Sequence, residues 1–318
     1  MEQNKPIGVS VIVCNYNAYL SSILLTMSSC LFQKECPFEI VYCDDGSKNN
    51  YEKEIKDFFK RNNFQDYVLE CSKENHGTLI NLTNGLRVSK YRYCKTIGCG
   101  DLFYDELSLK RVIDAFEKHR SDVVITNSCY FFDDGENIKS FNARNPIDIK
   151  CYLDKSYKPE TIKKRLLLNQ DLILGASVYA DTKYLLDLYE KFIGKIKYTE
   201  DALLVYAALF DAKIIYVEDY CVYYEYGTGI STSGQSEFQK IIQKECESLY
   251  DYMSTLDIDK RYKKYLNYRK KIRNSHGLKA ALLKLFLTPS QLMIKFKSKH
   301  VKKEKPQFDF YKKCKESH

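Results

Sequence analysis

The sequence has no hydrophobic run of membrane-spanning length and no recognisable targeting segment. None of the apolar runs in its 318 residues approaches the ~18 to 20 residues that a transmembrane helix needs. The first residues, MEQNKPIG, contain neither a basic start nor a hydrophobic stretch, so we expect no secretion signal and a location in the cytosol. With 44% hydrophobic and 29% charged residues, the chain is expected to fold as a globular protein.

Paired metal-binding cysteines are also missing. The chain has 12 cysteines but no CxxC pair, and Cys94 and Cys99 have no second pair that would complete a zinc site. Most of the others stand inside strand-like or helical segments, as Cys14, Cys30 and Cys43 do. A free thiol packs there as a small apolar group, so we expect reduced cysteines and no zinc.

Three common glycine-containing catalytic loops are absent. No GxGxxG follows the first apolar strand, and neither GxxxxGK[ST] nor GxSxG occurs. These absences disfavour a dinucleotide-binding dehydrogenase, a P-loop NTPase and a nucleophile elbow. The chemistry has to come from other groups.

Strand-like and helix-like segments alternate through the first hundred residues. Residues 8–14, GVSVIVC, are a continuous apolar run, and the segment after it repeats apolar residues at helical spacing from Leu20 to Leu31. The alternation continues with predicted strands and helices at 38–43, about 48–62, 67–71, 77–90 and 93–97. Continuous apolar strands separated by helices predict an α/β fold with a mostly parallel sheet covered on both faces. Ligands bind such sheets beyond the carboxyl ends of the strands.

The pattern is less regular after residue 100. The expected elements are a helix at 105–119, a strand at 122–132, a long connection at 133–157, a helix at about 159–169, a strand or loop at 172–180 that runs into a helix, a helix opening within 199–210 and a strand at 213–219. From about residue 238 the chain is expected to be helical and basic to its end.

Carboxylates at strand ends and helix starts are the candidate chemical groups. Asp44 and Asp45 follow the second predicted strand in FEIVYCDDGS, and Asp101 follows the fourth in IGCGD. Glu200 and Asp201 begin an apolar helix in TEDALL. Each has an ordinary structural explanation, because DDGS is typical of a turn and acids stabilise the first turn of a helix. From the residues alone, turn formation and ligand binding both stay open.

The order of these motifs resembles a known enzyme family. VSVIVCNYN, FEIVYCDDGS, ENHG, IGCGD, LGAS and TEDALL follow one another within about residues 7–233. The chain is similar to the family 2 glycosyltransferases of the GT-A fold, which include bacterial sugar transferases of capsule, O-antigen and other surface glycans. The resemblance implies a Rossmann-like, mostly parallel sheet flanked by helices. It also implies transfer from a nucleotide-diphosphate donor, expected to be a UDP-sugar, to a hydroxyl of a surface-polysaccharide or lipid-linked glycan.

The resemblance also implies which residues bind the donor. The family holds the nucleobase at the end of the first strand, which implies Cys14 and Tyr16 here, with the Tyr16 ring stacking on the base. The second acid of DDGS contacts the base edge, which implies Asp45. Asn75 and Gly77 match the turn before the helix that faces the donor.

Metal-binding and catalytic residues are implied in the same way. Asp101 falls in the family's DxD-like motif, which holds Mn²⁺ or Mg²⁺ and the donor diphosphate. Asp201 is the implied general base, with Glu200 beside it to raise its pKa above the ordinary value of ~3.9. One base and a single displacement imply inversion at the anomeric carbon. The segment near the acceptor is matched by Gly175, Ala176 and Ser177.

The chain departs from the family pattern at two places. Gly98 and Gly100 stand where acids are usual, and Glu225 and Gly227 stand where many members carry a basic or histidine residue. Either Asp101 binds the metal with help from the diphosphate, or metal dependence is weaker here. Two alternatives stay open: a GT-A-like binding or scaffold protein without a metal site, and a sugar-phosphate nucleotidylyltransferase. The latter class normally has a basic, glycine-rich loop after the first strand, which is missing.

Basic residues are concentrated in the C-terminal part of the chain. The net charge is +8, but residues 236–318 alone hold 21 Lys and Arg against 9 Asp and Glu. We predict a catalytic domain at 1–235 and a basic helical extension at 236–318. Residues 277–305 mix apolar residues with lysines, so they either pack on the catalytic domain or contact an anionic membrane surface. No nucleic-acid-binding module is recognisable, and we expect no nucleic-acid partner.

Overall fold

A single mixed sheet forms the centre of the molecule. The computed structural model describes residues 5–135, 137–227, 236–298 and 306–317. Within these residues nine strands pair in the order β3-β2-β1-β4-β8-β6-β9-β5, with β7 paired to β6. The strands are β1 (Val9–Asn15), β2 (Phe38–Asp45), β3 (Tyr67–Ser72), β4 (Tyr93–Gly98), β5 (Leu102–Phe103), β6 (Val123–Asp133), β7 (Ile138–Phe141), β8 (Val178–Asp181) and β9 (Ile214–Glu225).

The sheet is mostly parallel, as the sequence predicts. β1 pairs in parallel with β2 and β4, β2 with β3, and β6 with β9. The short strand β8 is antiparallel to both β4 and β6, so β6 and β9 keep the direction of the first four strands. β5 and β7 are antiparallel additions.

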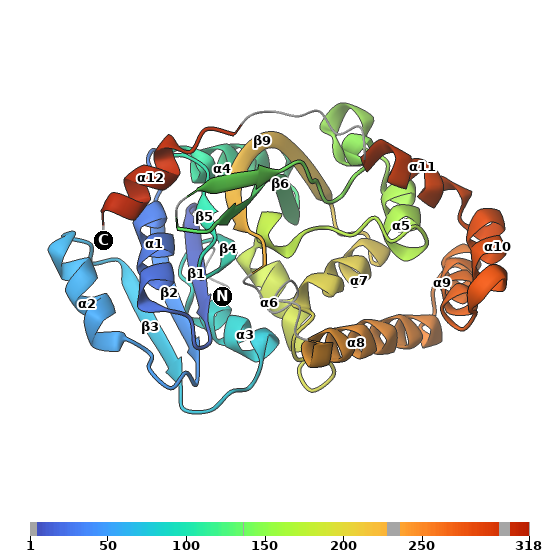
Figure 1. Ribbon diagram of the computed structural model, residues 1–318, viewed down its shortest axis with the longest axis horizontal. Helices are drawn as coiled ribbons and strands as arrows, with labels where there is room; N and C mark the ends of the chain where they lie inside the picture. Colours follow the sequence, from blue (N-terminus) through green and yellow to red (C-terminus); the bar gives the residue numbers. More distant parts are fainter. Residues whose placement is uncertain (1–4, 136, 228–235, 299–305, 318) are drawn as a thin grey trace.

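Helices cover both faces of the sheet (Figure 1). One layer consists of α1 (Leu20–Leu31), α2 (Glu52–Arg61) and α4 (Ser108–His119), and the other of α3 (Thr78–Val88), α5 (Pro159–Leu167), α6 (Thr182–Glu190) and α7 (Leu203–Leu209). In β1, Val11 and Val13 pack under the first layer and Ile12 packs under the second. The strand is apolar at successive positions because both of its faces are buried.

Several predicted boundaries are wrong by a few residues. The helix expected at 105–119 begins at Ser108, because the Asp105 carboxylate accepts the Leu107 N–H at 2.9 Å and forms a turn before it. The helices expected at 48–62 and 77–90 are shorter, at Glu52–Arg61 and Thr78–Val88.

Two predicted segments contain more structure than the sequence indicates. The connection at 133–157 includes β7 and two 3₁₀ turns, Ile149–Tyr152 and Asp154–Ser156. The late strand continues beyond 219 to Glu225, because β9 stays paired with β6 as far as Phe131 opposite Glu225.

The C-terminal helices share the core of the molecule. They are α8 (Ser236–Thr255), α9 (Lys260–Arg273), α10 (Gly277–Leu287), α11 (Pro289–Ser298) and α12 (Asp309–Glu316). Leu249 and Met253 of α8 and Leu266 of α9 are buried in the same cluster as α5, α6 and α7. α12 returns to the other end of the molecule and packs beside α1 (Figure 1). The helical prediction for this region is confirmed, whereas the domain boundary at residue 235 stays a prediction.

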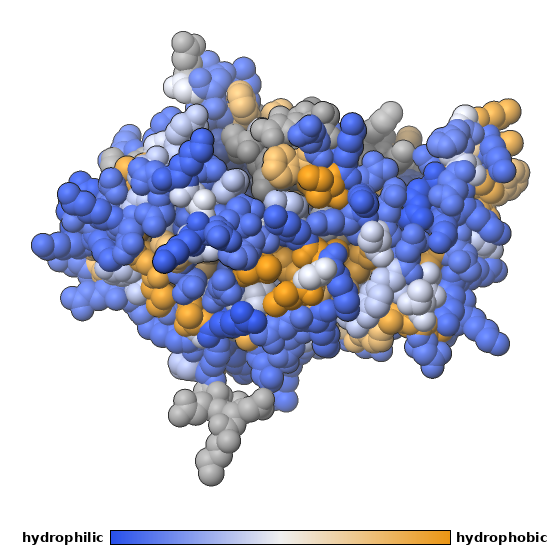
Figure 2. Space-filling model, turned by 90° about the horizontal axis from the view of Figure 1, so that it is seen from below, coloured by the Kyte–Doolittle hydropathy of each residue, from blue (hydrophilic) through white to orange (hydrophobic). Residues whose placement is uncertain are grey.

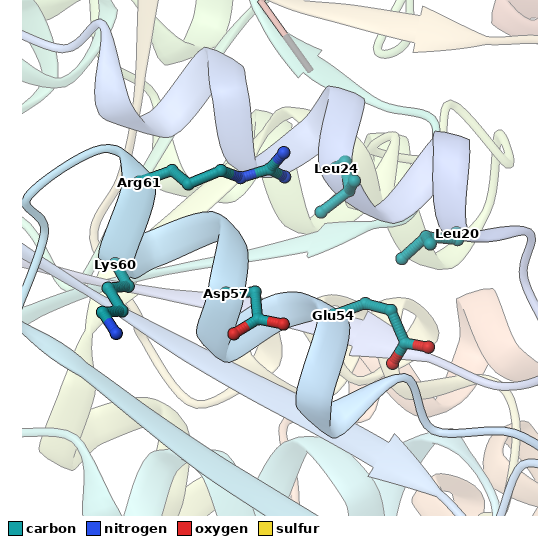
Figure 3. A pocket seen from close by; sticks show the side chains of 6 residues that line it. All are labelled: Leu20, Leu24, Glu54, Asp57, Lys60 and Arg61. Carbon is teal, nitrogen blue, oxygen red and sulfur yellow. The ribbon is translucent and has the colours of Figure 1, made fainter.

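An open groove lies between α1 and α2 (Figure 3). It has a volume of about 640 Å³ and is lined by Leu20, Leu24, Glu54, Asp57, Lys60 and Arg61. None of the candidate site residues lines it. Its lining mixes opposite charges without a common chemistry.

The shared core gives a test of the domain boundary. Met253→Ala removes a fully buried side chain and should lower the free energy of unfolding by about 2–5 kcal/mol in one cooperative transition. Chemical denaturation followed by circular dichroism measures this change. Leu278→Ala, at a side chain that is 78% exposed, is the control and should have little effect. A separate early transition, with the main transition unchanged, would support an independent C-terminal unit instead.

Candidate active site

Three neighbouring strands end at the same edge of the sheet. Asn15 at the end of β1 lies opposite Asp44 at the end of β2, and Cys14 lies opposite Gly98 at the end of β4. The predicted nucleotide and metal motifs are therefore adjacent. This edge is where parallel α/β sheets bind ligands.

Asp44 shapes the turn that follows β2. Its carboxylate accepts hydrogen bonds from Asn15 Nδ2 at 2.6 Å and from the Ser47 N–H at 2.9 Å. Gly46 has a φ of +72°, and a Cβ there would lie 2.5 Å from the backbone carbon of Glu74. The turn thus needs a glycine at position 46, where the loop before α3 lies against it.

Asp45 joins this turn to the start of α3. Its two carboxylate oxygens accept the N–H groups of His76 and Gly77, each at 2.8 Å. Gly77 is the N-cap residue of α3, so the buried carboxylate lies at the positive end of the helix. The structure therefore brings Asp45 together with Asn75 and Gly77. Their role in binding a nucleobase stays a prediction.

Cys14 and Tyr16 have different surroundings. The Cys14 thiol accepts a hydrogen bond from Asn81 Nδ2 at 3.3 Å, and burial raises the pKa of Cys14 to about 12, so it stays protonated. The Tyr16 side chain is 48% exposed beyond the end of β1. The backbone N–H of Asn17, the next residue, donates to Ser47 Oγ of the DDGS turn at 2.7 Å.

Asp101 lies in a tight turn held by α1. Thr26 Oγ1 accepts the Gly100 N–H at 2.9 Å and donates to the Asp101 carbonyl at 2.8 Å. Asp101 Oδ1 accepts the backbone N–H of Glu225 at 2.9 Å. Burial raises the pKa of Asp101 to about 7, although the Glu225 N–H and the charge of Lys95 act in the opposite direction.

Lys95 is a fully buried charge beneath the site. Its ammonium donates to the carbonyls of Thr96 and Ala176 at 2.6 and 2.7 Å. Burial lowers the pKa of Lys95 to about 8, and the Asp101 carboxylate opposes this effect. Lys95 thus links β4 to the predicted acceptor segment.

The predicted acceptor segment lies beside the candidate base. A Cβ on Gly175 would be 3.1 Å from Cβ of Asp201, so these two residues are in contact. Ala176 accepts the hydrogen bond of Lys95, and Ser177 is buried with its hydroxyl bonded to the Leu174 carbonyl. Gly175, Ala176 and Ser177 form a 3₁₀ turn before β8.

Glu200 and Asp201 are adjacent acids in the 3₁₀ turn Glu200–Ala202. In the described part of the chain, Glu200 Oε2 is buried without a hydrogen-bond partner. Burial, followed by the charge of Asp201, raises the pKa of Glu200 to about 8. The pKa of Asp201 is raised as well, because the surrounding protein desolvates its carboxyl group, although the residue keeps an exposed surface.

Glu245 of α8 holds the loop in front of this acid pair. Its carboxylate accepts the N–H groups of Lys197 and Tyr198 at 3.1 and 3.0 Å and the Thr199 hydroxyl at 3.0 Å. Sequence reasoning missed Glu245 because nothing local relates a residue of α8 to residues 197–199. It also missed Lys95, although a lysine inside the apolar run YCKTI was a usable signal.

A model of glycosyl transferase family 2 matches residues 10–183 of the sequence. This match spans more than half of the chain. The chain belongs to glycosyl transferase family 2. It is therefore a glycosyltransferase, and the predicted resemblance is confirmed. A search by sequence among curated proteins found no match.

Solved structures agree with the GT-A fold. S. aureus TarS 1-349 is similar with a TM-score of 0.52 and 17% identity, over 98% of this chain and 91% of that chain. The same TarS fragment in complex with UDP-GlcNAc gives a TM-score of 0.51 at 16% identity, with the same coverage. At this identity the similarity concerns the fold alone.

A divalent cation suits the donor atoms at the Asp101 turn. Family 2 glycosyltransferases commonly use divalent metal ions. Among the described residues no three His, Cys, Asp or Glu side chains are grouped as a metal site. Asp101 and Glu225 nevertheless bring two carboxylates to one turn, and oxygen ligands are those that Mg²⁺ and Mn²⁺ prefer. Residues 228–233 of the segment that follows lie outside the described residues.

The raised pKa of Glu200 predicts a pH-dependent stability. Between its ordinary pKa and about 8, the folded state binds more protons at Glu200 than the unfolded state does, so this group costs stability as the pH rises. Glu200→Gln cannot ionise. Its melting temperature should exceed that of the wild type by a margin that grows from about pH 5 to about pH 8. The exposed Glu237→Gln is the control, and a margin independent of pH would contradict the assignment.

Proposed function

We propose that this glycosyltransferase transfers a sugar from a UDP-sugar to a hydroxyl of a surface-polysaccharide or lipid-linked glycan, with inversion at the anomeric carbon. The observation that carries the proposal is the position of the acids: Asp45 ends β2, Asp101 follows the end of β4, and Asp201 touches the turn that precedes β8, which pairs with β4. S. aureus TarS 1-349 is described in complex with UDP-GlcNAc, which makes a UDP-N-acetylhexosamine the first donor to test.

The donor side of the proposal rests on groups at the ends of β1 and β2. Each oxygen of Asp45 accepts one backbone N–H and keeps further acceptor capacity for the edge of a base. The exposed ring of Tyr16 supplies a face on which a base stacks. Asp101 would hold Mn²⁺ or Mg²⁺, which when bound supplies positive charge against the diphosphate.

The acceptor side of the proposal rests on the acid pair. The acceptor oxygen forms a bond to the anomeric carbon, and its proton passes to the Asp201 carboxylate. The bond between the anomeric carbon and the diphosphate breaks, and its electron pair leaves with the nucleotide. Because the pKa of Glu200 is raised to about 8, Glu200 keeps its proton at neutral pH, and we assign the role of proton acceptor to Asp201. Gly175, in the predicted acceptor segment, lies directly against Asp201.

Substitution of the two acids separates their roles. Asp201→Asn should lower kcat by at least about 100-fold, because it removes the proton acceptor. Glu200→Gln should keep most of the activity at neutral pH, since the glutamine resembles the protonated acid. Release of UDP and transfer of sugar, measured with a panel of nucleotide sugars, test both variants. The exposed Asp187→Asn is the matched control. Full activity of Asp201→Asn would remove the base assignment, and no turnover of any donor by the wild type would remove the proposed function.

We also propose that α10 contacts the inner surface of the cell membrane, where a lipid-linked acceptor is presented on the cytosolic side. Among the described residues no helix is long and apolar enough to cross a membrane. Leu278, Leu282, Leu285 and Phe286 are exposed and recur at helical spacing on one face of α10. Figure 2 shows hydrophobic atoms at the right-hand end of the molecule, the end at which α10 lies in Figure 1. The excess of Lys and Arg in residues 236–318 complements anionic head groups.

Vesicle binding tests the membrane proposal. Combined Leu282→Gln and Phe286→Gln should weaken binding of the full chain to vesicles rich in phosphatidylglycerol by at least about tenfold, because two apolar side chains lose their burial in lipid. Co-sedimentation measures the bound fraction. Phe141→Gln, at an exposed residue of β7, is the control. Equal binding of the double variant and the wild type would contradict a role for α10.

A further inference from the structure

The carboxylate of Glu225 lies where a side chain at position 100 would otherwise point. Gly100 is buried, has a φ of +102°, and a Cβ built on it would lie 2.3 Å from Oε2 of Glu225. At Gly98 the nearest atom to such a Cβ is Oδ2 of Asp101, at 3.9 Å. The two positions that lack acids therefore differ, because one is filled by a carboxylate from another strand and the other is open.

The sheet fixes Glu225 at this place. β5 pairs with the end of β9, with Leu102 opposite Tyr223, and β6 pairs with it from the other side, with Phe131 opposite Glu225. Leu102, Phe131 and Tyr223 are buried in one apolar cluster, which holds the register of all three strands. The backbone of Glu225 is consequently fixed beside the turn by core packing.

Asp101 and Glu225 are also joined directly. The Glu225 N–H donates to Oδ1 of Asp101 at 2.9 Å, and Thr26 fixes both the Gly100 N–H and the Asp101 carbonyl. Oδ2 of Asp101 accepts no hydrogen bond within the described residues, and it faces the open position at Gly98. The turn between β4 and β5 thus carries the Asp101 carboxylate and lies against the carboxylate of Glu225, which comes from the end of β9.

We propose that Glu225 supplies the acid that the metal motif lacks at position 100, and that Asp101 and Glu225 together bind the divalent cation of the donor. Carboxylate oxygens suit Mg²⁺ and Mn²⁺, and the diphosphate of the nucleotide provides further oxygen ligands. A side chain at position 100 would displace the Glu225 carboxylate, and the φ of +102° makes any substitution there strained. This inference rests on the proposed function, since it assigns the cation of that reaction.

Binding of Mn²⁺ to the full chain tests the inference without relying on turnover. Electron paramagnetic resonance of free Mn²⁺, titrated with protein in the presence and absence of UDP, gives the affinity directly. Glu225→Gln and Asp101→Asn should each weaken Mn²⁺ binding by at least about tenfold, because each removes a charged ligand. Glu218→Gln, an exposed acid on the same strand, is the matched control and should bind Mn²⁺ as the wild type does. Thermal unfolding checks that the variants are folded.

The outcomes separate this inference from the proposed function. Mn²⁺ binding that is unchanged in Glu225→Gln, or absent from a wild type that turns over a nucleotide sugar, overturns the inference and leaves the proposed function standing. Mn²⁺ binding that is lost in both variants, in a protein that turns over no nucleotide sugar, supports the site and contradicts the proposed function.

Discussion

The in-register pairing of β1 with β2 and β4 is the constraint on which the site depends. It places Asn15 opposite Asp44 and Cys14 opposite Gly98, so three strands end at one level. A slip of one residue would turn every side chain of a strand to the opposite face of the sheet. The buried positions of β1 prevent such a slip, because Val11 and Val13 fit one helical layer and Ile12 fits the other. The position of the polar groups at this edge is therefore set by apolar packing below it.

The acids at this edge are used in two different ways. Asp44, Asp45 and Glu245 each accept backbone N–H groups and so fix loops. An acid that is buried without a hydrogen-bond partner belongs to a second kind, because burial favours its protonated form. Glu200 is of the second kind, since its Oε2 has no partner among the described residues and the pKa of Glu200 rises to about 8. Burying this ionisable group lowers the stability of the fold, and such strongly shifted acids are typical of a site with a chemical role.

The sequence predicted the parts of the site that follow from local patterns. Apolar strands that end at Asn15 and Asp45, and one followed closely by Asp101, predict a sheet edge, because strand period and turn residues are local properties. Contacts between distant segments have no such signal. Glu225 fills the space at Gly100 only because β9 runs past the turn after β4 and pairs with β5, and Glu245 reaches residues 197–199 from a helix that begins about forty residues later. The start of α4 was missed for a related reason. The sequence around Asp105 fits either a turn or the first turn of a helix, and only the hydrogen bond from the Leu107 N–H to the Asp105 carboxylate distinguishes them.

The C-terminal helices brace both acidic parts of the site. Glu245 of α8 holds the backbone immediately before Glu200, and the Gln307 carbonyl, just before α12, accepts the hydroxyl of Tyr223, two residues before Glu225. α12 also packs Tyr311 against the ring of Tyr223. These contacts connect the helices after residue 235 with the loop of Glu200 and with the end of β9. Because the loop of Glu200 and the end of β9 each gain a fixed position from this region, the basic extension contributes to the geometry of the acids as well as to the surface.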